Sequence, residues 1–335
     1  MKKLKVAHFG IAHDHSGVTM ECARKYPDVY EVVGICEPDE AMRAEYGGDP
    51  AYVGVPWITE EELLSRDDID AVFCEGHELR SVSDAQKCID RGLHVHLDKP
   101  GGIDLVAFER LLRSAEEKGL TLQMGYMYRW NPAFQYVWKK VKSGELGTIT
   151  GIDGAFSITH ISEKRKWLKQ FPGGMMFYIG CHLIDMIMLL MQTVDNPFGT
   201  PKAIVPFNHS SDWENDGSMD SSFAVLDYSH GACTVRTNAT EVNGYATRRL
   251  RVCGTEGTLE IQPLECPTLL TEVTREEAAN HRGENTARNI FPGYLAGRYD
   301  DMMLEFAACV RGEMKNPISW QYELELQRVL LEACK

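Results

Sequence analysis

The chain has 335 residues, with 49 acidic against 35 basic side chains and a formal net charge of −14. This charge, together with the lack of any Lys/Arg-rich run, argues against a nucleic-acid partner, because phosphate backbones are bound through clustered cations. The longest apolar run, after His182, is interrupted by Asp185, so we expect no membrane span and a cytoplasmic protein. The length suits about two domains.

The first 126 residues alternate apolar, β-branched runs with amphipathic segments. Strands are predicted at 3–11, 30–39, 69–76, 93–100 and 120–126, and helices at 16–27, 61–68, 80–92 and 103–119. Strands separated by helices of this length predict a parallel sheet that is covered on both faces. We therefore expect an N-terminal α/β domain over residues 1–122.

The pattern changes after Thr148. Predicted strands at 148–161, 203–210, 221–229, 232–242 and 248–263 follow one another without helices between them, except for one helix around His182. Two amphipathic helices are expected at 300–313 and 321–334. Runs of strands joined by turns favour a mostly antiparallel sheet, so we predict a second domain over residues 123–335.

Ten cysteines are scattered through the chain, and the closest two are Cys253 and Cys266. Because no CxxC pair occurs, we interpret them as buried thiols rather than as a disulfide or zinc framework. Histidines could also serve as metal ligands, and the candidates are His13, His15, His77, His94 and His96. We expect no metal, since His94 and His96 lie within a strand covered on both faces and His13 and His15 lie in a loop.

Loops that follow parallel strands are where ligands bind in such sheets. The first of them, "FGIAHDHSG", contains Gly10 but has Ala12 and His15 where a dinucleotide fingerprint would have two further glycines. Glu37 ends the second strand, where a carboxylate can accept both ribose hydroxyls of NAD and would repel a 2′-phosphate. Glu37 could equally be a solvated strand-end side chain. Together the two features favour a dinucleotide, and NAD over NADP.

The stretch "GGMMFYIGCHLIDMIMLLM" is apolar apart from Tyr178, His182 and Asp185. Helices that are hydrophobic all round are normally buried, and an unpartnered buried polar group costs about 1 to 3 kcal/mol. Spacings of four and three residues predict one helical stripe that faces a common cleft.

Several motifs occur in the order typical of one enzyme family. "LDKPGG", "GYMYRWNPAF" and "KWLKQFPGGMMFYIGCHLID" succeed one another along the chain, followed by "CGTEGTLEI". In these motifs the chain resembles the Gfo/Idh/MocA oxidoreductases, which include inositol dehydrogenases and glucose-fructose oxidoreductases. The resemblance implies an N-terminal Rossmann domain that binds NAD(P). It also implies a C-terminal α/β domain with a large, open, mostly antiparallel sheet that commonly serves for oligomerisation, so we expect a homodimer or homotetramer.

The resemblance also implies site residues. The implied catalytic residues are Lys99, His182, Asp185 and Tyr178. The implied cofactor contacts are Gly10, Ile11, Ala12, His13, His15, Glu37, Glu75, Gly76, His77, Asp98 and Lys99. The implied substrate contacts are Arg129, Trp167 and Tyr178, and His160 is added from its strand. Asp98 replaces the family's usual glutamate, and Tyr178 stands where many sugar dehydrogenases have an aspartate.

These residue types suit hydride transfer. A nicotinamide takes a hydride from a carbinol carbon while a base takes the hydroxyl proton, and imidazole suits that role near neutral pH. We expect His182 to be the base, Asp185 to orient it, Lys99 to polarise the oxygen and Tyr178 to donate a hydrogen bond.

The leading hypothesis is an NAD-dependent dehydrogenase acting on a ring hydroxyl of a small sugar, cyclitol or related polyol. One alternative is an NAD-dependent glycosidase or lyase that oxidises a sugar only transiently. Another is a non-catalytic NAD-binding regulator.

Overall fold

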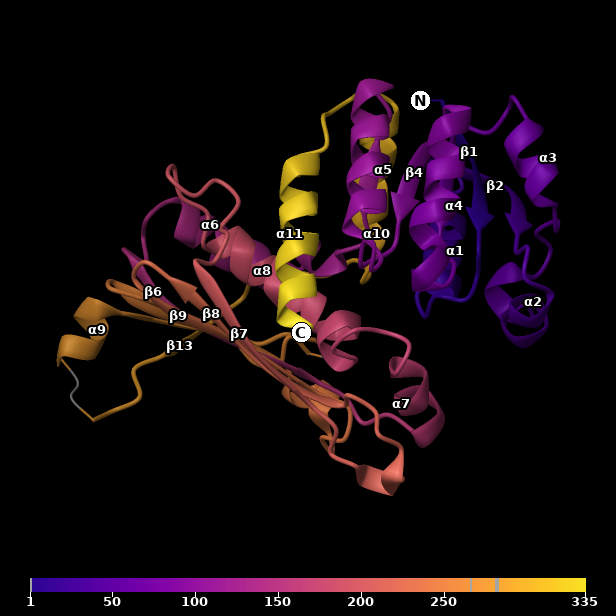
Figure 1. The fold of residues 1–335 in the computed structure, drawn as a ribbon. Helices are drawn as coiled ribbons and strands as arrows, with labels where there is room; N and C mark the ends of the chain where they lie inside the picture. The colour runs from indigo at the N-terminus through magenta and orange to yellow at the C-terminus, as the bar shows by residue number, and fades with distance from the viewer. Residues whose placement is uncertain (1, 266, 281–282) are drawn as a thin grey trace. The chain divides into compact units, whose positions relative to one another are not determined.

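The computed structural model describes residues 2–265, 267–280 and 283–335 (Figure 1). Contacts divide the chain into two units, Met1–Met127 with Ala296–Leu324, and Tyr128–Leu295 with Glu325–Lys335. This division differs from the predicted boundary, because the first unit recruits a segment from near the end of the chain.

The first unit contains the expected parallel sheet. Its strands are β1 (Leu4–Phe9), β2 (Tyr30–Cys36), β3 (Ala71–Cys74), β4 (His94–Leu97) and β5 (Leu122–Met124). They are ordered β2-β1-β3-β4-β5, and every pair is parallel. The chain moves from β1 to β2 on one side and then to β3 on the other, so the topology switches between β1 and β3, where open α/β sheets bind ligands.

Helices cover both faces of this sheet (Figure 1). They are α1 (Ser16–Lys25), α2 (Glu40–Tyr46), α3 (Glu60–Ser65), α4 (Glu78–Arg91), α5 (Leu105–Glu117) and α10 (Asp300–Val310). Phe306 of α10 packs 6.0 Å from the ring of Phe73 and 5.8 Å from that of His96. Cys74 points to the opposite face and contacts Cys88 of α4. The unit therefore needs the returning helix α10 to bury one face of its sheet.

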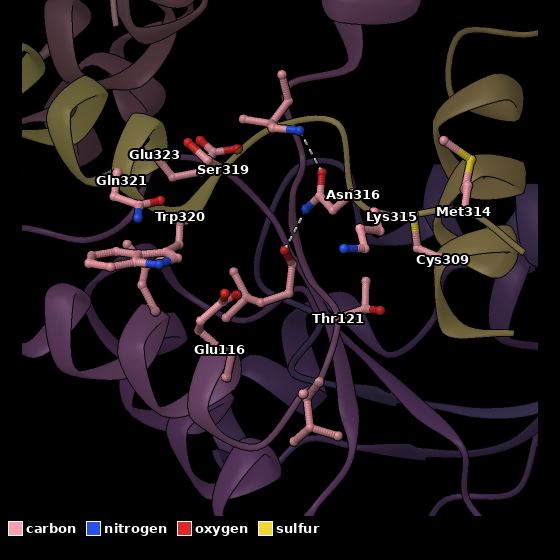
Figure 2. A pocket seen from close by; sticks show the side chains of 16 residues that line it. Glu116, Thr121, Cys309, Met314, Lys315, Asn316, Ser319, Trp320, Gln321 and Glu323 are labelled. Carbon is pink, nitrogen blue, oxygen red and sulfur yellow. Dashed lines mark hydrogen bonds between the residues drawn. The ribbon is translucent and has the colours of Figure 1, made fainter. Parts of the chain in front are cut away.

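A cavity of about 470 Å³ lies in the first unit beside the start of β5 (Figure 2). Asn316 lines this cavity. Its side-chain amide donates to the carbonyl oxygen of Leu122 at 3.0 Å, and its Oδ1 accepts the backbone N–H of Ile318 at 3.0 Å. Since β5 is parallel to its neighbour, this cavity lies at the amino ends of the strands, at the opposite edge from the loops that follow the strands.

The second unit is built on a sheet of eight strands. They are β6 (Ile149–Ser157), β7 (Ala203–His209), β8 (Ser221–Tyr228), β9 (Gly231–Asn238), β10 (Arg249–Gly254), β11 (Gly257–Ile261), β12 (Leu270–Thr274) and β13 (Arg288–Ile290). Their order is β13-β12-β11-β10-β6-β9-β8-β7, and only the β6–β9 pair is parallel among the described residues. The predicted α/β fold, with a parallel and a mostly antiparallel sheet, is confirmed.

The helices of this unit include α6 (Pro132–Lys142), α7 (Ser162–Leu168), α8 (Cys181–Leu190) and α9 (Arg275–Asn280), and α11 (Trp320–Ala333) runs across the division between the units. Helix α8 packs on one face of the sheet, where Gly154 of β6 makes room for Leu183: a Cβ on that glycine would lie 2.6 Å from the leucine side chain. The opposite face leaves Phe207 and Phe223 partly exposed.

The segment before α8 departs from the expected helix. Residues Met176–Gly180 form a π-helical turn, and the α-helix begins only at Cys181. The prediction of one uniform α-helical stripe is therefore wrong at its first step, from Tyr178 to His182. π turns change the direction of the side chains that precede them and often occur at functional sites.

Within the described ranges, every helix is too short or too polar to span a bilayer. The nine cysteines in those ranges are free thiols, eight of them buried, and Cys266 lies outside the described residues.

Candidate active site

The loop after β1 begins with a glycine that no other residue could replace without strain. Gly10 has φ = +82°, and a Cβ on it would lie 2.3 Å from Cα of Gly76 in the loop after β3. The same two loops are joined by a hydrogen bond from the backbone N–H of His13 to the carbonyl oxygen of Glu75, at 3.0 Å. The predicted cofactor residues in these loops are thus neighbours at the switch point.

Asp98, after β4, is the centre of a buried polar cluster. Its Oδ2 lies 3.1 Å from Nδ1 of His13 and 2.9 Å from Nδ1 of His15. Burial opposes ionisation of Asp98, but the two imidazoles outweigh it and hold the pKa of Asp98 well below its usual value. Burial lowers the pKa of His15 to about 4, whereas Asp98 and Glu78 overcome burial and raise the pKa of His13.

Glu75 lies beside this cluster and is fully buried. Burial first, and then the neighbouring carboxylate of Asp98, raise the pKa of Glu75 well above its usual value. Gly76 and His77 continue the loop, and His77 caps α4 by accepting the backbone N–H of Leu79 at 3.2 Å.

Lys99 follows Asp98 directly and is only 2% exposed. Its backbone N–H donates to Oδ1 of Asp98 at 2.7 Å, and its carbonyl oxygen lies 3.2 Å from Nε2 of His13. The Lys99–Pro100 peptide bond is cis. This lysine is therefore withdrawn from water at the end of β4.

Glu37 uses both carboxylate oxygens within its own unit. Oε2 accepts the backbone N–H of Ile11 at 2.9 Å, and Oε1 accepts that of Asp39 at 3.0 Å. Glu37 is therefore 8% exposed rather than solvated, and it holds the first loop in place. Each oxygen keeps a second lone pair that could accept a ribose hydroxyl.

In the second unit, His182 on α8 is 4% exposed and packs edge-on against Tyr128, with ring centroids 4.9 Å apart. The hydroxyl of Tyr128 donates to Glu265 and accepts from Arg248 at 3.0 Å. This buried network fixes the aromatic wall beside the imidazole.

Asp185 forms a buried ion pair with Arg129. Nε and Nη2 of the guanidinium donate to its two carboxylate oxygens at 2.9 and 2.8 Å. Arg129, for which the substrate contact stays a prediction, is 2% exposed and uses these two donors on Asp185. The structure therefore gives Arg129 a role in orienting Asp185, while the expected contact of Asp185 with His182 stays a prediction.

Tyr178, in the π turn, belongs to a group of rings at the end of α7. Its ring lies 5.5 Å from that of Trp167 and 5.8 Å from that of His160. The ammonium of Lys164 lies 3.6 Å from the centre of the Trp167 ring and 4.9 Å from that of Tyr178. Three predicted substrate residues are thus brought together, with a lysine that the sequence reasoning had missed.

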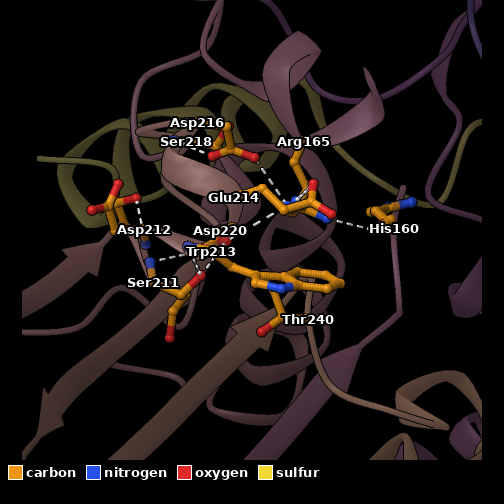
Figure 3. Close-up of polar contacts among 12 residues, drawn as sticks. His160, Arg165, Ser211, Asp212, Trp213, Glu214, Asp216, Ser218, Asp220 and Thr240 are labelled. Carbon is orange, nitrogen blue, oxygen red and sulfur yellow. Dashed lines mark hydrogen bonds and ion pairs between the residues drawn. The ribbon is translucent and has the colours of Figure 1, made fainter. Parts of the chain in front are cut away.

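Arg165 anchors this helix (Figure 3). It is fully buried, and it donates to Asp216 at 3.1 Å, to Glu214 at 2.6 Å and to the carbonyl oxygen of His160 at 2.8 Å. The loop that supplies the carboxylates has three non-glycine residues with φ between 50 and 59°, Asp212, Glu214 and Asn215. Such backbone costs about 1 kcal/mol or more per residue and persists only where contacts hold it.

The missed residues had only weak sequence signals. Lys164 and Trp167 are three residues apart in "EKRKW", the spacing at which helical side chains meet, so their contact could have been expected. The carboxylate partners of Arg165 are about fifty residues away in sequence, and no local pattern marks them.

Two family models match the chain. Residues 9–126 match the oxidoreductase family with an NAD-binding Rossmann fold, and residues 134–260 match the Gfo/Idh/MocA C-terminal domain. The chain belongs to the Gfo/Idh/MocA family. As an oxidoreductase of that family it carries the NAD-binding Rossmann domain in its first unit.

Curated relatives of this Gfo/Idh/MocA chain include sugar and cyclitol dehydrogenases. The protein "D-xylose 1-dehydrogenase (NADP(+)) 2" of Haloferax volcanii is 27% identical over 73% of this chain and 73% of its own length. The protein "scyllo-inositol 2-dehydrogenase (NADP(+)) IolW" of Bacillus subtilis is 29% identical over 42% of this chain and 38% of its own length.

Solved structures share the fold over nearly the whole chain. A crystal structure of an oxidoreductase from Desulfitobacterium hafniense, described as NADPH-dependent, has a TM-score of 0.82 at 19% identity and covers 100% of this chain and 95% of its own. KijD10, a 3-ketoreductase from Actinomadura kijaniata solved with TDP-benzene and NADP, has a TM-score of 0.75 at 19% identity and covers 99% and 96%. At these identities the likeness concerns the fold.

Proposed function

We propose that this oxidoreductase is an NAD-dependent dehydrogenase that oxidises a ring hydroxyl of a small sugar, cyclitol or related polyol. The observation that carries the proposal is the position of Lys99: a lysine withdrawn from water, in a loop that meets the glycine loop at the switch point of the sheet. The sugar and inositol dehydrogenases among the relatives support the substrate class.

The first unit fits a dinucleotide. Gly10 approaches Gly76 so closely that any side chain would fill the turn, and α1 begins six residues later with its N–H groups toward that loop, as phosphate sites require. Gly10, Ile11, Ala12, His13 and His15 would line the pyrophosphate, and Asp98 and Lys99 the nicotinamide end. When bound, the nicotinamide accepts a hydride.

Cofactor choice is assigned to Glu37. Its carboxylate is fixed by the N–H groups of Ile11 and Asp39, so it cannot easily turn away from a 2′-phosphate. Titrations of NAD and NADP test this. We expect tighter binding of NAD, and the Glu37→Ser substitution should narrow the difference by about 1 to 3 kcal/mol. Since two relatives are named for NADP, tighter binding of NADP is the result that would overturn the preference.

The chemistry is assigned to His182 and Lys99. His182 takes the hydroxyl proton, its ring held by Tyr128, and the Arg129–Asp185 pair keeps a carboxylate fixed on the following turn of α8. Lys99 supplies the positive charge that favours the alkoxide as the proton leaves. The flat rings of Trp167 and Tyr178 suit the C–H face of a sugar ring, and the Tyr178 hydroxyl can donate to a substrate oxygen.

A panel of sugars, inositols and glycosides, each mixed with purified protein and NAD, tests the function. We expect NADH absorbance to rise with at least one of them, together with a product two mass units lighter. Product formed without net NADH would instead favour the glycosidase or lyase mechanism. Dinucleotide binding without turnover of any compound would favour the regulator.

For assembly we propose a homodimer or homotetramer through the open face of the second unit's sheet. On β7 and β8 the directly paired residues Phe207 and Phe223, and Val205 and Val225, share that face, and Val205 and Phe207 are 49% and 46% exposed. Contiguous apolar surface of this kind marks interfaces. Light scattering should give a multiple of the chain mass, and the Phe207→Glu variant should give the monomer.

A further inference from the structure

Two imidazoles of the first unit converge on one carboxylate oxygen. Oδ2 of Asp98 lies 3.1 Å from Nδ1 of His13 and 2.9 Å from Nδ1 of His15, and these three atoms all lie within 4.8 Å of one another. Ligand atoms that share one tetrahedral metal ion, at bond lengths near 2.0 to 2.1 Å, are separated by about 3.4 Å. The cluster therefore has nearly the spacing that a shared ion would impose.

The hydrogen bonding of His13 places a lone pair toward Asp98. Nε2 of His13 faces only acceptors, the carbonyl oxygen of Lys99 at 3.2 Å and Oε1 of Glu78 at 3.6 Å, so it must carry a proton. In neutral imidazole Nδ1 is then unprotonated, and the backbone N–H of His15, 3.2 Å away, points to it as to an acceptor. At 3.1 Å, Nδ1 and the carboxylate oxygen are held together either by a proton on Nδ1 or by a metal ion between them, and metal titration distinguishes the two.

A second carboxylate points to the same nitrogen. Glu75 is fully buried, and neither of its carboxyl oxygens accepts a hydrogen bond in the part of the chain that the structure describes. Its Oε2 lies 3.9 Å from Nδ1 of His13. A buried carboxyl without a donor is costly, and a cation held by His13 and Asp98 would offset that cost.

The outer contacts of these side chains are those of metal ligands. Metal-binding histidines usually donate their other ring N–H to a carbonyl or carboxylate oxygen, as His13 does to Lys99. Asp98 accepts the backbone N–H of Lys99 at Oδ1, 2.7 Å away, which leaves Oδ2 for an ion. We propose that His13, His15 and Asp98 bind one divalent transition-metal ion through Nδ1, Nδ1 and Oδ2, with Glu75 adjacent.

Two imidazoles and one carboxylate suit Zn²⁺, Fe²⁺ or Co²⁺ rather than Mg²⁺ or Ca²⁺. This proposal differs from the sequence-based expectation of no metal, because the third ligand comes from another strand end, 83 residues beyond His15 in sequence. His94 and His96, the other candidates, have separate partners: Nδ1 of His94 accepts the N–H of Thr121, and Nδ1 of His96 lies 3.0 Å from Gln123.

Metal titration of the full chain tests the site. Protein treated with a chelator is titrated with Co²⁺ and with Zn²⁺, followed by calorimetry and by the visible absorption of bound Co²⁺, without dinucleotide. We expect one ion per chain, with binding weakened about 10- to 100-fold or more in both His15→Asn and Asp98→Asn. His209→Gln, which removes an exposed histidine of the second unit, should leave the titration unchanged.

Absence of saturable binding at one equivalent would overturn the proposal, as would binding that both variants retain, and the cluster would then hold only protons. His15 has 14% of its side chain exposed, so its substitution should leave a folded protein, which the melting temperature without metal checks. NAD binding measured on the same samples separates this proposal from the dehydrogenase: retained NAD binding without metal binding refutes the ion alone.

Discussion

The two clusters of candidate functional side chains, one in each unit, are held together in different ways. In the first unit His13, His15 and Asp98 meet because their loops follow neighbouring parallel strands, which end at the same edge of a sheet. In the second unit Trp167 lies on the short helix α7, which Arg165 ties to a strained loop, and Tyr178 lies in the π turn before α8. The two rings meet because both segments are held in place. The position of the first group thus follows from topology, and that of the second depends on a few long-range side-chain contacts.

Removing the anchor of the second group should have the largest effect. Arg165→Leu leaves Asp216 and Asp220, both buried, without their cation, and breaking a buried pair in this way costs about 3 to 5 kcal/mol. Urea unfolding measures the loss. Lys166→Leu, at the exposed neighbouring position, should change stability by no more than about 0.5 kcal/mol. A loss below 1 kcal/mol in Arg165→Leu would mean that the loop holds α7 by other contacts.

One proposed catalytic residue from each unit can be substituted, so that the contribution of each unit to turnover is compared. Lys99→Ala and His182→Ala should each lower kcat by about 10²-fold or more, the usual scale for positioned acid–base groups, while NAD affinity changes less. Steady-state kinetics on a substrate from the panel measures this. Lys202→Ala and His209→Ala, at exposed positions, serve as controls. Near wild-type turnover in both Lys99→Ala and His182→Ala would refute the assignment.

The first unit should also be the more sensitive to acid. Burial lowers the pKa of His8 to about 3, so between pH 6.5 and 3 the unfolded chain binds a proton that the folded chain excludes. Stability contributed by this group is therefore present above pH 6.5 and falls as pH falls through that window. Between pH 7 and 5 the free energy of unfolding should therefore fall by about 2 kcal/mol less in His8→Gln than in the wild type, as measured by urea unfolding at each pH. Parallel stability profiles for the variant and the wild type would contradict this.

The mildest change expected is Tyr178→Phe. The variant keeps the ring packed against Trp167 and loses only the hydroxyl, so turnover should fall less than about tenfold, which corresponds to less than about 1.4 kcal/mol. A fall of 10²-fold, with substrate KM unchanged, would instead place the hydroxyl in the proton relay.

Most of the secondary structure of the first unit could be predicted from the sequence. Its five strands were predicted from β-branched runs, and the resemblance placed Gly10, Asp98 and Lys99 at strand ends, where the structure has them. The short helix α2 was missed, although Asp39 caps it by accepting the N–H groups of Ala41 and Met42. The convergence of His13 with Asp98 was also missed, because spacing along one loop says nothing about a residue in another.

The second unit was less predictable. Helix α6 was missed although Asn131 caps it and Pro132 begins it, a recognisable start signal. The π turn has no comparable signal, because nearly every residue around Tyr178 and His182 is apolar and no change of spacing marks the turn. Likewise the ion pair of Arg129 with Asp185 joins residues 56 positions apart, beyond any local pattern.

The return of residues 296–324 to the first unit bears on how the protein is made. Tyr30, Gln123 and Leu122 take their partners from that segment, through Met303, Met302 and Asn316. During synthesis the nucleotide-binding sheet emerges early but keeps one face uncovered until nearly the whole chain has been translated, a delay of about 10 to 40 seconds at ordinary elongation rates. An isolated fragment ending at Met127 should therefore aggregate, and during that interval the nascent chain is a natural client for a chaperone.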